Sequence, residues 1–214
     1  MKCFAALFAA IDQSTKTNVK VAALADYFRT APEDDRIWTI ALFSGRRPKR
    51  AVTTTRLREW AAERADIPLW LFEEAYPIVG DLAETIALVL PPADLTSDHS
   101  LSHWINALRG LSDVGELGKK AFVLDAWDML PATQRFLFNK LLTGGFRVGI
   151  SQKLMTRALA RATDRDEAEL AHRLMGAWDP ATVTSEALSE ADDPSAPAAR
   201  PYPFYLAYPA RDPP

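Results

Sequence analysis

The 214-residue sequence has little of what stabilises a secreted or membrane protein. It contains one cysteine, Cys3, so it cannot form an internal disulfide framework, and it fits a reducing compartment such as the cytoplasm. No uninterrupted apolar run approaches the roughly 18 residues of a membrane-spanning helix, so we expect no membrane partner. With 48% hydrophobic and 25% charged residues, the chain can instead bury the core of a globular protein of one or two domains.

The sequence also lacks the motifs of the common catalytic sites. The Gly144–Gly145 pair does not have the spacing of a phosphate-binding or dinucleotide-binding loop, and no Gly-x-Ser-x-Gly elbow occurs. His99 and His103 have a metal-like spacing of four residues, but no third and fourth ligand follows, and Ser, Asp and His at a helix start are common in capping. We therefore expect no catalytic residue, no metal site and no cofactor for this chain.

The net charge of −3 hides an uneven distribution of basic residues. Residues 44–58 and 129–163 contain no acid, and the rest of the chain has 13 basic residues against all 28 acids, a charge of −15. The two segments hold twelve basic residues: Arg46, Arg47, Lys49, Arg50, Arg56, Arg58, Arg135, Lys140, Arg147, Lys153, Arg157 and Arg161. Such segregation predicts a positive surface that binds a polyanion backbone, although charge runs can also be ordinary solvated faces.

The stretch from Thr143 to Lys153 combines a helix end, a turn and a helix start. Glycines end the first helix, and Ser151 is placed to cap the second. The second helix has an apolar face, and its other face is predicted to carry a basic stripe of Lys153, Arg157, Arg161 and Arg165. A glycine turn leading into the positive end of a helix is suited to a phosphate backbone.

Apolar residues at helical spacing predict an all-α fold. We expect helices over 3–11, 19–28, 36–43, 56–65 and 82–90, and a further helix that Asp66 caps and that has Pro68 in its first turn. Lys2 and the apolar run after it could also be a short signal sequence, but the helical stripe favours a core helix. Residues 82–90 could also form a strand, but their spacing favours a helix.

The second half of the chain resembles the first at an offset of 99 residues. Arg36 matches Arg135, Pro32 matches Pro131, and Ser44–Gly45 matches Thr143–Gly144, while Gly80–Asp81 resembles the corner from Gly176 to Asp179. The identities are few, so chance is the alternative. We expect one helical domain over 1–191 with pseudo-twofold halves at about 1–92 and 100–191, whose two basic turns could straddle a duplex. Residues 192–214 are predicted to be a proline-rich linker.

Four segments form a set in this order along the chain: Ser44–Arg50, Gly80–Glu84, Phe138–Gly149 and Pro201–Phe204. Together they resemble the N-terminal DNA-binding domain of bacterial ATP-dependent DNA ligases, and the resemblance covers nearly the whole chain. It implies an all-helical domain that grips duplex or nicked DNA through phosphate and minor-groove contacts. The site residues it implies, with their neighbours in the two turns, are Ser44, Gly45, Arg46, Arg47, Lys49, Arg50, Gly144, Gly145, Arg147, Gly149, Ser151, Gln152, Lys153 and Arg157.

The sequence departs from such ligases at the catalytic motif. None of its eight lysines is followed by the x-Asp-Gly that accompanies the AMP-accepting lysine of the family. We therefore expect a monomeric domain, excised or separately encoded, that is inactive alone; ATP, Mg²⁺ and the adenylation and OB domains would belong to the rest of a ligase. The resemblance implies a role in DNA repair, replication or recombination near a bacterial nucleoid. The alternatives are a helical scaffold that docks an acidic protein and an enzyme with an unrecognised site.

Overall fold

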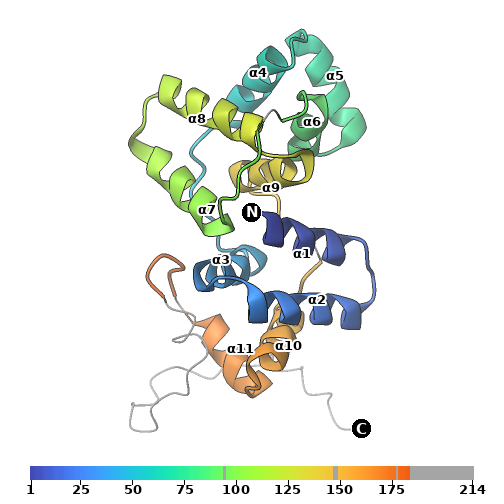
Figure 1. Cartoon of the computed structure of the whole chain (residues 1–214), viewed down its shortest axis with the longest axis vertical. Coiled ribbons are helices and arrows are strands. Elements are labelled where there is room, and N and C mark those ends of the chain that lie inside the picture. Colours follow the sequence, from blue (N-terminus) through green and yellow to red (C-terminus); the bar gives the residue numbers. More distant parts are fainter. Residues whose placement is uncertain (94, 147–148, 177, 184–214) are drawn as a thin grey trace, which may run out of the picture.

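The described part of the chain folds into α-helices joined by turns and longer loops (Figure 1). The computed structural model describes residues 1–93, 95–146, 149–176 and 178–183, and within these ranges there are eleven α-helices, one 3₁₀ turn and no strand. This confirms the predicted all-α class. The helices are α1 (Lys2–Asp12), α2 (Thr17–Thr30), α3 (Glu33–Phe43), α4 (Thr54–Arg64), α5 (Leu69–Val79), α6 (Leu82–Val89), α7 (Leu101–Gly110), α8 (Glu116–Met129), α9 (Ala132–Thr143), α10 (Gln152–Thr163) and α11 (Glu167–Met175), with the 3₁₀ turn at Leu111–Asp113.

Side-chain caps fix the starts of several helices. The Ser151 hydroxyl accepts from the Leu154 amide at 3.2 Å, which confirms the predicted cap of α10. The predicted cap at Asp66 is wrong: Asp66 has a φ of 53° in the turn after α4, and α5 begins after Pro68 with no side-chain cap. The predicted basic stripe also included one residue that is not in the helix, because α10 ends at Thr163 and Arg165 lies beyond it.

The repeat seen in the sequence recurs in the helix boundaries. Five pairs of helices start 98 or 99 residues apart: α1 with α7, α2 with α8, α3 with α9, α4 with α10, and α5 with α11. Left-handed turn residues recur at the same offsets, Gly45 with Gly144 and Asp66 with Asp164. The correspondence ends at Gly80, whose φ is 82° while that of Gly176 is −62°, so the predicted likeness of these two corners is wrong.

Helices α2 and α8, which correspond to each other in the repeat, end in the same way because a proline and then an arginine follow each of them. Proline has no N–H, so Pro32 and Pro131 leave the carbonyls four residues earlier without a helical partner. The Arg36 guanidinium donates to one of these carbonyls, that of Phe28, at 3.4 Å. In the second copy, Arg135 donates to the Trp127 carbonyl from Nε at 2.9 Å and from Nη2 at 2.5 Å.

The helices gather in two groups that exchange members between the two halves of the sequence. Helices α1, α2, α3, α10 and α11 form the lower group in Figure 1, and α4 to α9 form the upper one. Helix α10 packs on α2, α3 and α11, whereas α9 packs on α6 and α7; α1 with α9 and α3 with α7 join the groups. The predicted halves therefore interlock around one core and are not separate bodies.

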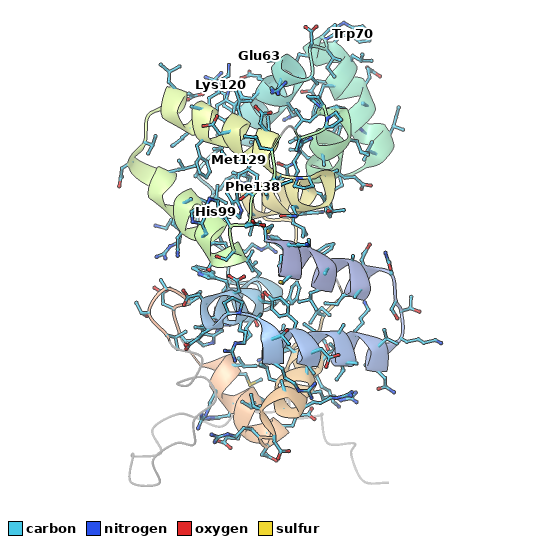
Figure 2. The ribbon with its side chains drawn as sticks, in the orientation of Figure 1. Glu63, Trp70, His99, Lys120, Met129 and Phe138 are labelled. Carbon is cyan, nitrogen blue, oxygen red and sulfur yellow. The ribbon has the colours of Figure 1, made fainter. Side chains whose placement is uncertain are left out.

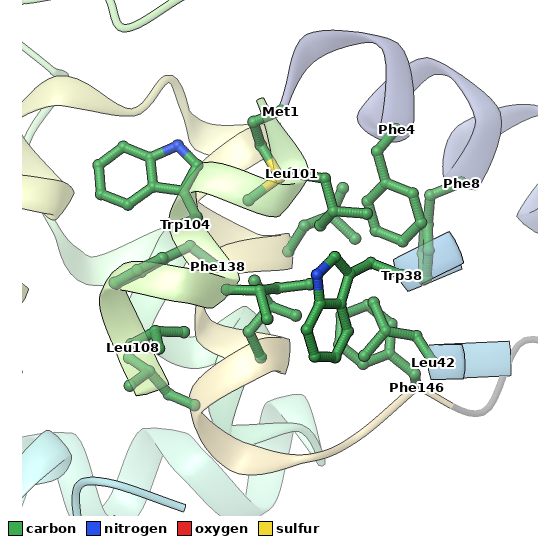
Figure 3. Packing of buried hydrophobic residues seen from close by; sticks show 14 of the residues in the cluster. Met1, Phe4, Phe8, Trp38, Leu42, Leu101, Trp104, Leu108, Phe138 and Phe146 are labelled. Carbon is green, nitrogen blue, oxygen red and sulfur yellow. The ribbon is translucent and has the colours of Figure 1, made fainter. Parts of the chain in front are cut away.

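Aromatic and aliphatic side chains from α1, α3, α7 and α9 meet where the two groups join. Figure 3 shows Phe4, Trp38, Leu101 and Phe138 from these four helices in one cluster, together with Phe146 from the turn before α10. The buried carboxylate of Asp35 caps α7 across this junction, because it accepts from the Leu101 amide at 3.2 Å and the Ser102 amide at 2.8 Å. The junction fixes the turns that follow α3 and α9 relative to each other.

Candidate nucleic-acid interface

The two basic turns predicted from the sequence lie against each other. The turn after α3 reaches the turn after α9, since Arg50 Nη2 donates to the Thr143 carbonyl at 3.1 Å. A Cβ placed on Gly144 would lie 3.2 Å from Arg47 Nη1, so the Arg47 guanidinium covers this glycine. A hollow of about 380 Å³ separates the turns and is lined by Leu42, Phe43, Ser44, Gly45, Arg47, Phe146, Gly149 and Ile150. The turns thus form one composite surface, called here the twin-turn surface.

Glycine is required in the twin-turn surface for its backbone conformation. Gly45, Gly144 and Gly149 have φ values of 81°, 79° and 61°, which other L-residues rarely adopt. The Nζ of Lys20 on α2 lies next to Gly149, at 3.6 Å from where a Cβ would be, which is an ordinary van der Waals distance. The pattern analysis missed Lys20, since a lysine in a surface helix has no sequence signal that would place it beside a turn 129 residues away.

Phe146 anchors the second turn and is another residue that the pattern analysis did not single out. Its ring is 6% exposed and lies 6.0 Å from the ring of Phe4 and 6.4 Å from that of Phe8, both on α1. An aromatic residue between two glycine positions was the available signal, because such a residue has to bury its ring somewhere. Its burial holds the turn on the core while its neighbours stay at the surface.

Most of the predicted site residues lie at the twin-turn surface. Arg47, Lys49, Arg50 and Lys153 are exposed, Arg157 is half-buried on α10, and Gln152 is exposed at the first position of that helix. Ser44 ends α3, and a Cβ on Gly145 would lie 3.4 Å from Lys140 Nζ. Arg147 lies outside the described residues. Among the described residues, the exposed cations of the two turns and of the start of α10 are Arg47, Lys49, Arg50 and Lys153.

Arg46 does not lie with this set, although the sequence grouped it there. Its Nη2 donates to the carbonyls of Leu174 and Gly176 at 3.3 and 2.9 Å, and its guanidinium lies 4.4 Å from the Trp178 ring centre. Arg46 thus satisfies carbonyls at the C-terminal end of α11. These contacts hold the first turn to α11, and the predicted phosphate contact of Arg46 stays a prediction.

Other basic residues of the two acid-free segments are held by acids from elsewhere in the chain or by the core. Arg56 pairs with Glu59 at 2.8 Å and also with Glu116, while Arg58 Nη1 donates to both Glu73 oxygens. Arg135 is 2% exposed. Figure 2 shows a similar pair in the upper group, Lys120 on α8 and Glu63 on α4, whose charged atoms are 2.6 Å apart. Charge segregation along the sequence therefore overstates the positive surface.

Lys140 in α9 is also paired, with the carboxylate that caps α6. The Lys140 ammonium donates to Asp81, and the Glu84 amide donates to the same carboxylate at 3.0 Å. Partial burial raises the pKa of Asp81, but these hydrogen bonds and the lysine charge together hold it below its ordinary value. The pair ties α9 to α6 just before the second turn.

The structure provides no metal site among the residues it describes. No group of three potential ligands comes together there, and His99 and His103 stack on each other with ring centres 3.8 Å apart. Within the same residues, no helix is long and apolar enough to cross a membrane.

Residues 1–160 match the family profile described as DNA ligase N terminus. The chain belongs to this family. The matched range ends within α10 and therefore includes both turns of the twin-turn surface. No curated protein matches the chain. Membership in this family establishes that the chain is a DNA ligase N-terminal domain, as the sequence motifs indicated.

Proposed function

We propose that this DNA ligase N-terminal domain binds duplex DNA at the twin-turn surface without reading its sequence. The observation that supports this most is the direct contact of two glycine turns that present Arg47, Lys49, Arg50 and Lys153 on one surface. Exposed arginine and lysine side chains neutralise phosphates, which are the same at every base pair. The partner is duplex or nicked DNA during repair, replication or recombination in the cytoplasm, next to the nucleoid if the source is bacterial.

The contact of the two turns fits the edges of one groove better than the opposite sides of a duplex. Arg50 bridges the turns at 3.1 Å, so their cations are close together. The minor groove is about 6 Å wide between its two phosphate backbones, so adjoining turns can contact both backbones. The domain acts as a monomer that positions the duplex, and adenylation and OB domains, where present, would perform ligation with ATP and Mg²⁺.

Salt dependence tests the proposed contact. If each of four exposed cations neutralises one phosphate, the logarithm of the binding constant falls with the logarithm of salt at a slope of about −3.6. Affinity should then drop about 150-fold between 50 and 200 mM salt. The measurement is fluorescence anisotropy of a labelled nicked duplex titrated with the chain.

Single substitutions assign the charge to residues. Arg47→Ala should weaken all DNA sequences alike and reduce the slope by about one. Arg58→Ala removes the same charge from the same acid-free segment, but Arg58 is held by Glu73, so its slope should stay at the wild-type value. Equal effects of the two substitutions would show that only net charge matters and would overturn the assignment to the twin-turn surface.

Competition and labelling test the other classes of function. Excess random duplex should displace the labelled DNA completely, whereas a scaffold for an acidic protein would bind random duplex weakly. Incubation with labelled ATP should give no covalent AMP on the chain, because the lysine motif of the family's catalytic domain does not occur in it. Transfer of AMP to the chain would refute the proposal of a binding domain.

A further inference from the structure

A second hollow lies beside the twin-turn surface, between the turn after α3 and the C-terminal end of α11. It has a volume of about 670 Å³, within the roughly 300–1,000 Å³ of small-molecule sites. The lining combines two tryptophans with four cations and one carboxylate: Trp38, Arg46, Arg47, Pro48, Lys49, Arg109, Ser112, Trp178, Asp179 and Pro180. A pocket with these groups suits a ligand that is both planar and anionic.

Two guanidinium groups of the pocket are each held over an indole ring. The Arg46 guanidinium carbon lies 4.4 Å from the ring centre of Trp178, and that of Arg109 lies 5.7 Å from the ring centre of Trp38. Arg46 is fixed further by its hydrogen bonds to the Leu174 and Gly176 carbonyls. Nucleobases stack on aromatic rings and on guanidinium planes. Trp38 is 5% exposed and lies behind Arg109, so the surfaces open to a base are those of Arg46, Arg109 and Trp178.

The other two cations of the pocket are at its rim. Arg47 and Lys49 are exposed, and Arg47 also lines the hollow between the two turns. An anionic group entering the pocket would meet four positive charges against the single carboxylate of Asp179, a local charge of +3. Lysine and arginine at these positions can donate to a phosphate, whereas an uncharged aromatic ligand would leave their charges without a partner in the ligand.

We propose that this pocket binds an unpaired nucleotide, with the base against the arginine–tryptophan walls and the phosphate on Arg47 and Lys49. The nucleotide belongs either to the unpaired end of a DNA strand or to a free nucleoside phosphate. This rests on and deepens the proposed function, because the rim residues Arg47 and Lys49 also belong to the surface assigned to the duplex. A strand end that leaves the duplex at the twin-turn surface would meet the pocket directly.

Calorimetric titration of the chain tests the pocket with three probes: a 5′-phosphorylated single-stranded tetranucleotide, dAMP and inorganic phosphate. Both nucleotide probes should bind more tightly than phosphate, because base stacking adds about 5- to 100-fold in affinity. A tetranucleotide that binds at least tenfold more tightly than dAMP identifies a strand end, and equal affinity identifies a free nucleotide. Phosphate that binds as tightly as both nucleotides would overturn the proposal.

Two variants locate the binding. Ser112→Phe places a ring in the pocket from an exposed position in the 3₁₀ turn, and Arg109→Ala removes a guanidinium from an exposed position on α7. Each should weaken nucleotide binding about tenfold, whereas Arg165→Ala, which removes an exposed arginine outside the pocket, should not. Unchanged nucleotide affinity in Ser112→Phe with an unchanged melting temperature would refute the site.

Blunt duplex distinguishes this inference from the proposed function. Ser112→Phe and Arg109→Ala should bind blunt duplex with wild-type affinity and salt slope, since neither residue lies in the twin-turn surface. If the wild type binds dAMP but no duplex, the proposed function fails and the pocket stands. If it binds duplex but neither nucleotide probe, the pocket fails and the proposed function stands.

Discussion

Replacing Arg135 separates a basic residue that stabilises the fold from those that we propose bind DNA. Arg135 lies in an acid-free segment, yet its guanidinium donates to the Trp127 carbonyl and, through Nη1 at 2.8 Å, to the Pro91 carbonyl. Arg135 is 2% exposed, and this burial, which partly desolvates the cation, lowers the pKa of Arg135. The substitution Arg135→Ala would leave two carbonyls without this donor.

The repeat supplies the matched control, Arg36→Ala. Each hydrogen bond to a charged group contributes about 1.5–3 kcal/mol to stability. Removing Arg135 also removes the cost of desolvating its cation, which offsets part of the stability lost with the bonds. We therefore expect Arg135→Ala to lower the free energy of unfolding by about 3 kcal/mol. Arg36 is half-buried and makes one 3.4 Å bond to Phe28, so its loss should be about 1 kcal/mol.

Urea unfolding followed by circular dichroism measures both losses. In addition, Arg135→Ala should keep the wild-type salt slope for DNA at temperatures where it stays folded, although it removes the same charge as Arg47→Ala. A loss for Arg135→Ala no greater than that for Arg36→Ala would refute the carbonyl-capping argument. A reduced salt slope would refute its separation from the DNA surface.

Two further predictions concern single contacts near the turns. The pKa of Asp81 is lowered in the folded protein, so its ionised carboxylate stabilises the fold above the ordinary carboxyl pKa of 3.8, and this stabilisation is lost as pH falls through the folded pKa. Asp81→Asn should therefore make the free energy of unfolding depend less on pH in that acidic range. An unchanged pH dependence would contradict this. Gly144→Ala puts a Cβ residue at a φ of 79° beside Arg47 and should cost about 1–2 kcal/mol of stability measured by thermal unfolding, while a cost near zero would show that the turn relaxes freely.

Local patterns sufficed to predict the helices, because apolar spacing and caps act within a few residues. The helix class of residues 82–90 and the Ser151 cap are confirmed in this way. The cap at Asp66 failed because a left-handed aspartate at the end of one helix has the same sequence signature as a cap before the next. The motifs also led to the DNA ligase N-terminal family, which the profile match confirms.

Long-range partners limited what the sequence could indicate about the site. Arg46 and Arg47 are adjacent and chemically identical, yet Arg46 turns to carbonyls about 130 residues away while Arg47 stays exposed. Likewise, the acids that hold Arg58 and Lys140 come from other helices. A charge pattern within one segment contains no information on these pairings, so only the fold could separate surface cations from internal ones.

The contact between the two turns follows from how the repeats interlock. Because α10 packs on α2 and α3 while α9 packs on α6, the turn after α9 has to cross from one group of helices to the other beside the turn after α3. The connection from α3 to α4 also runs between the two groups, and Arg50 in it donates to Thr143 at the end of α9. Equivalent turns in two separate bodies would lie apart and contact DNA independently, whereas interlocked repeats bring their cations into one patch. The exchange of helices between the repeats therefore brings the two copies of one turn into the single surface that we propose for DNA.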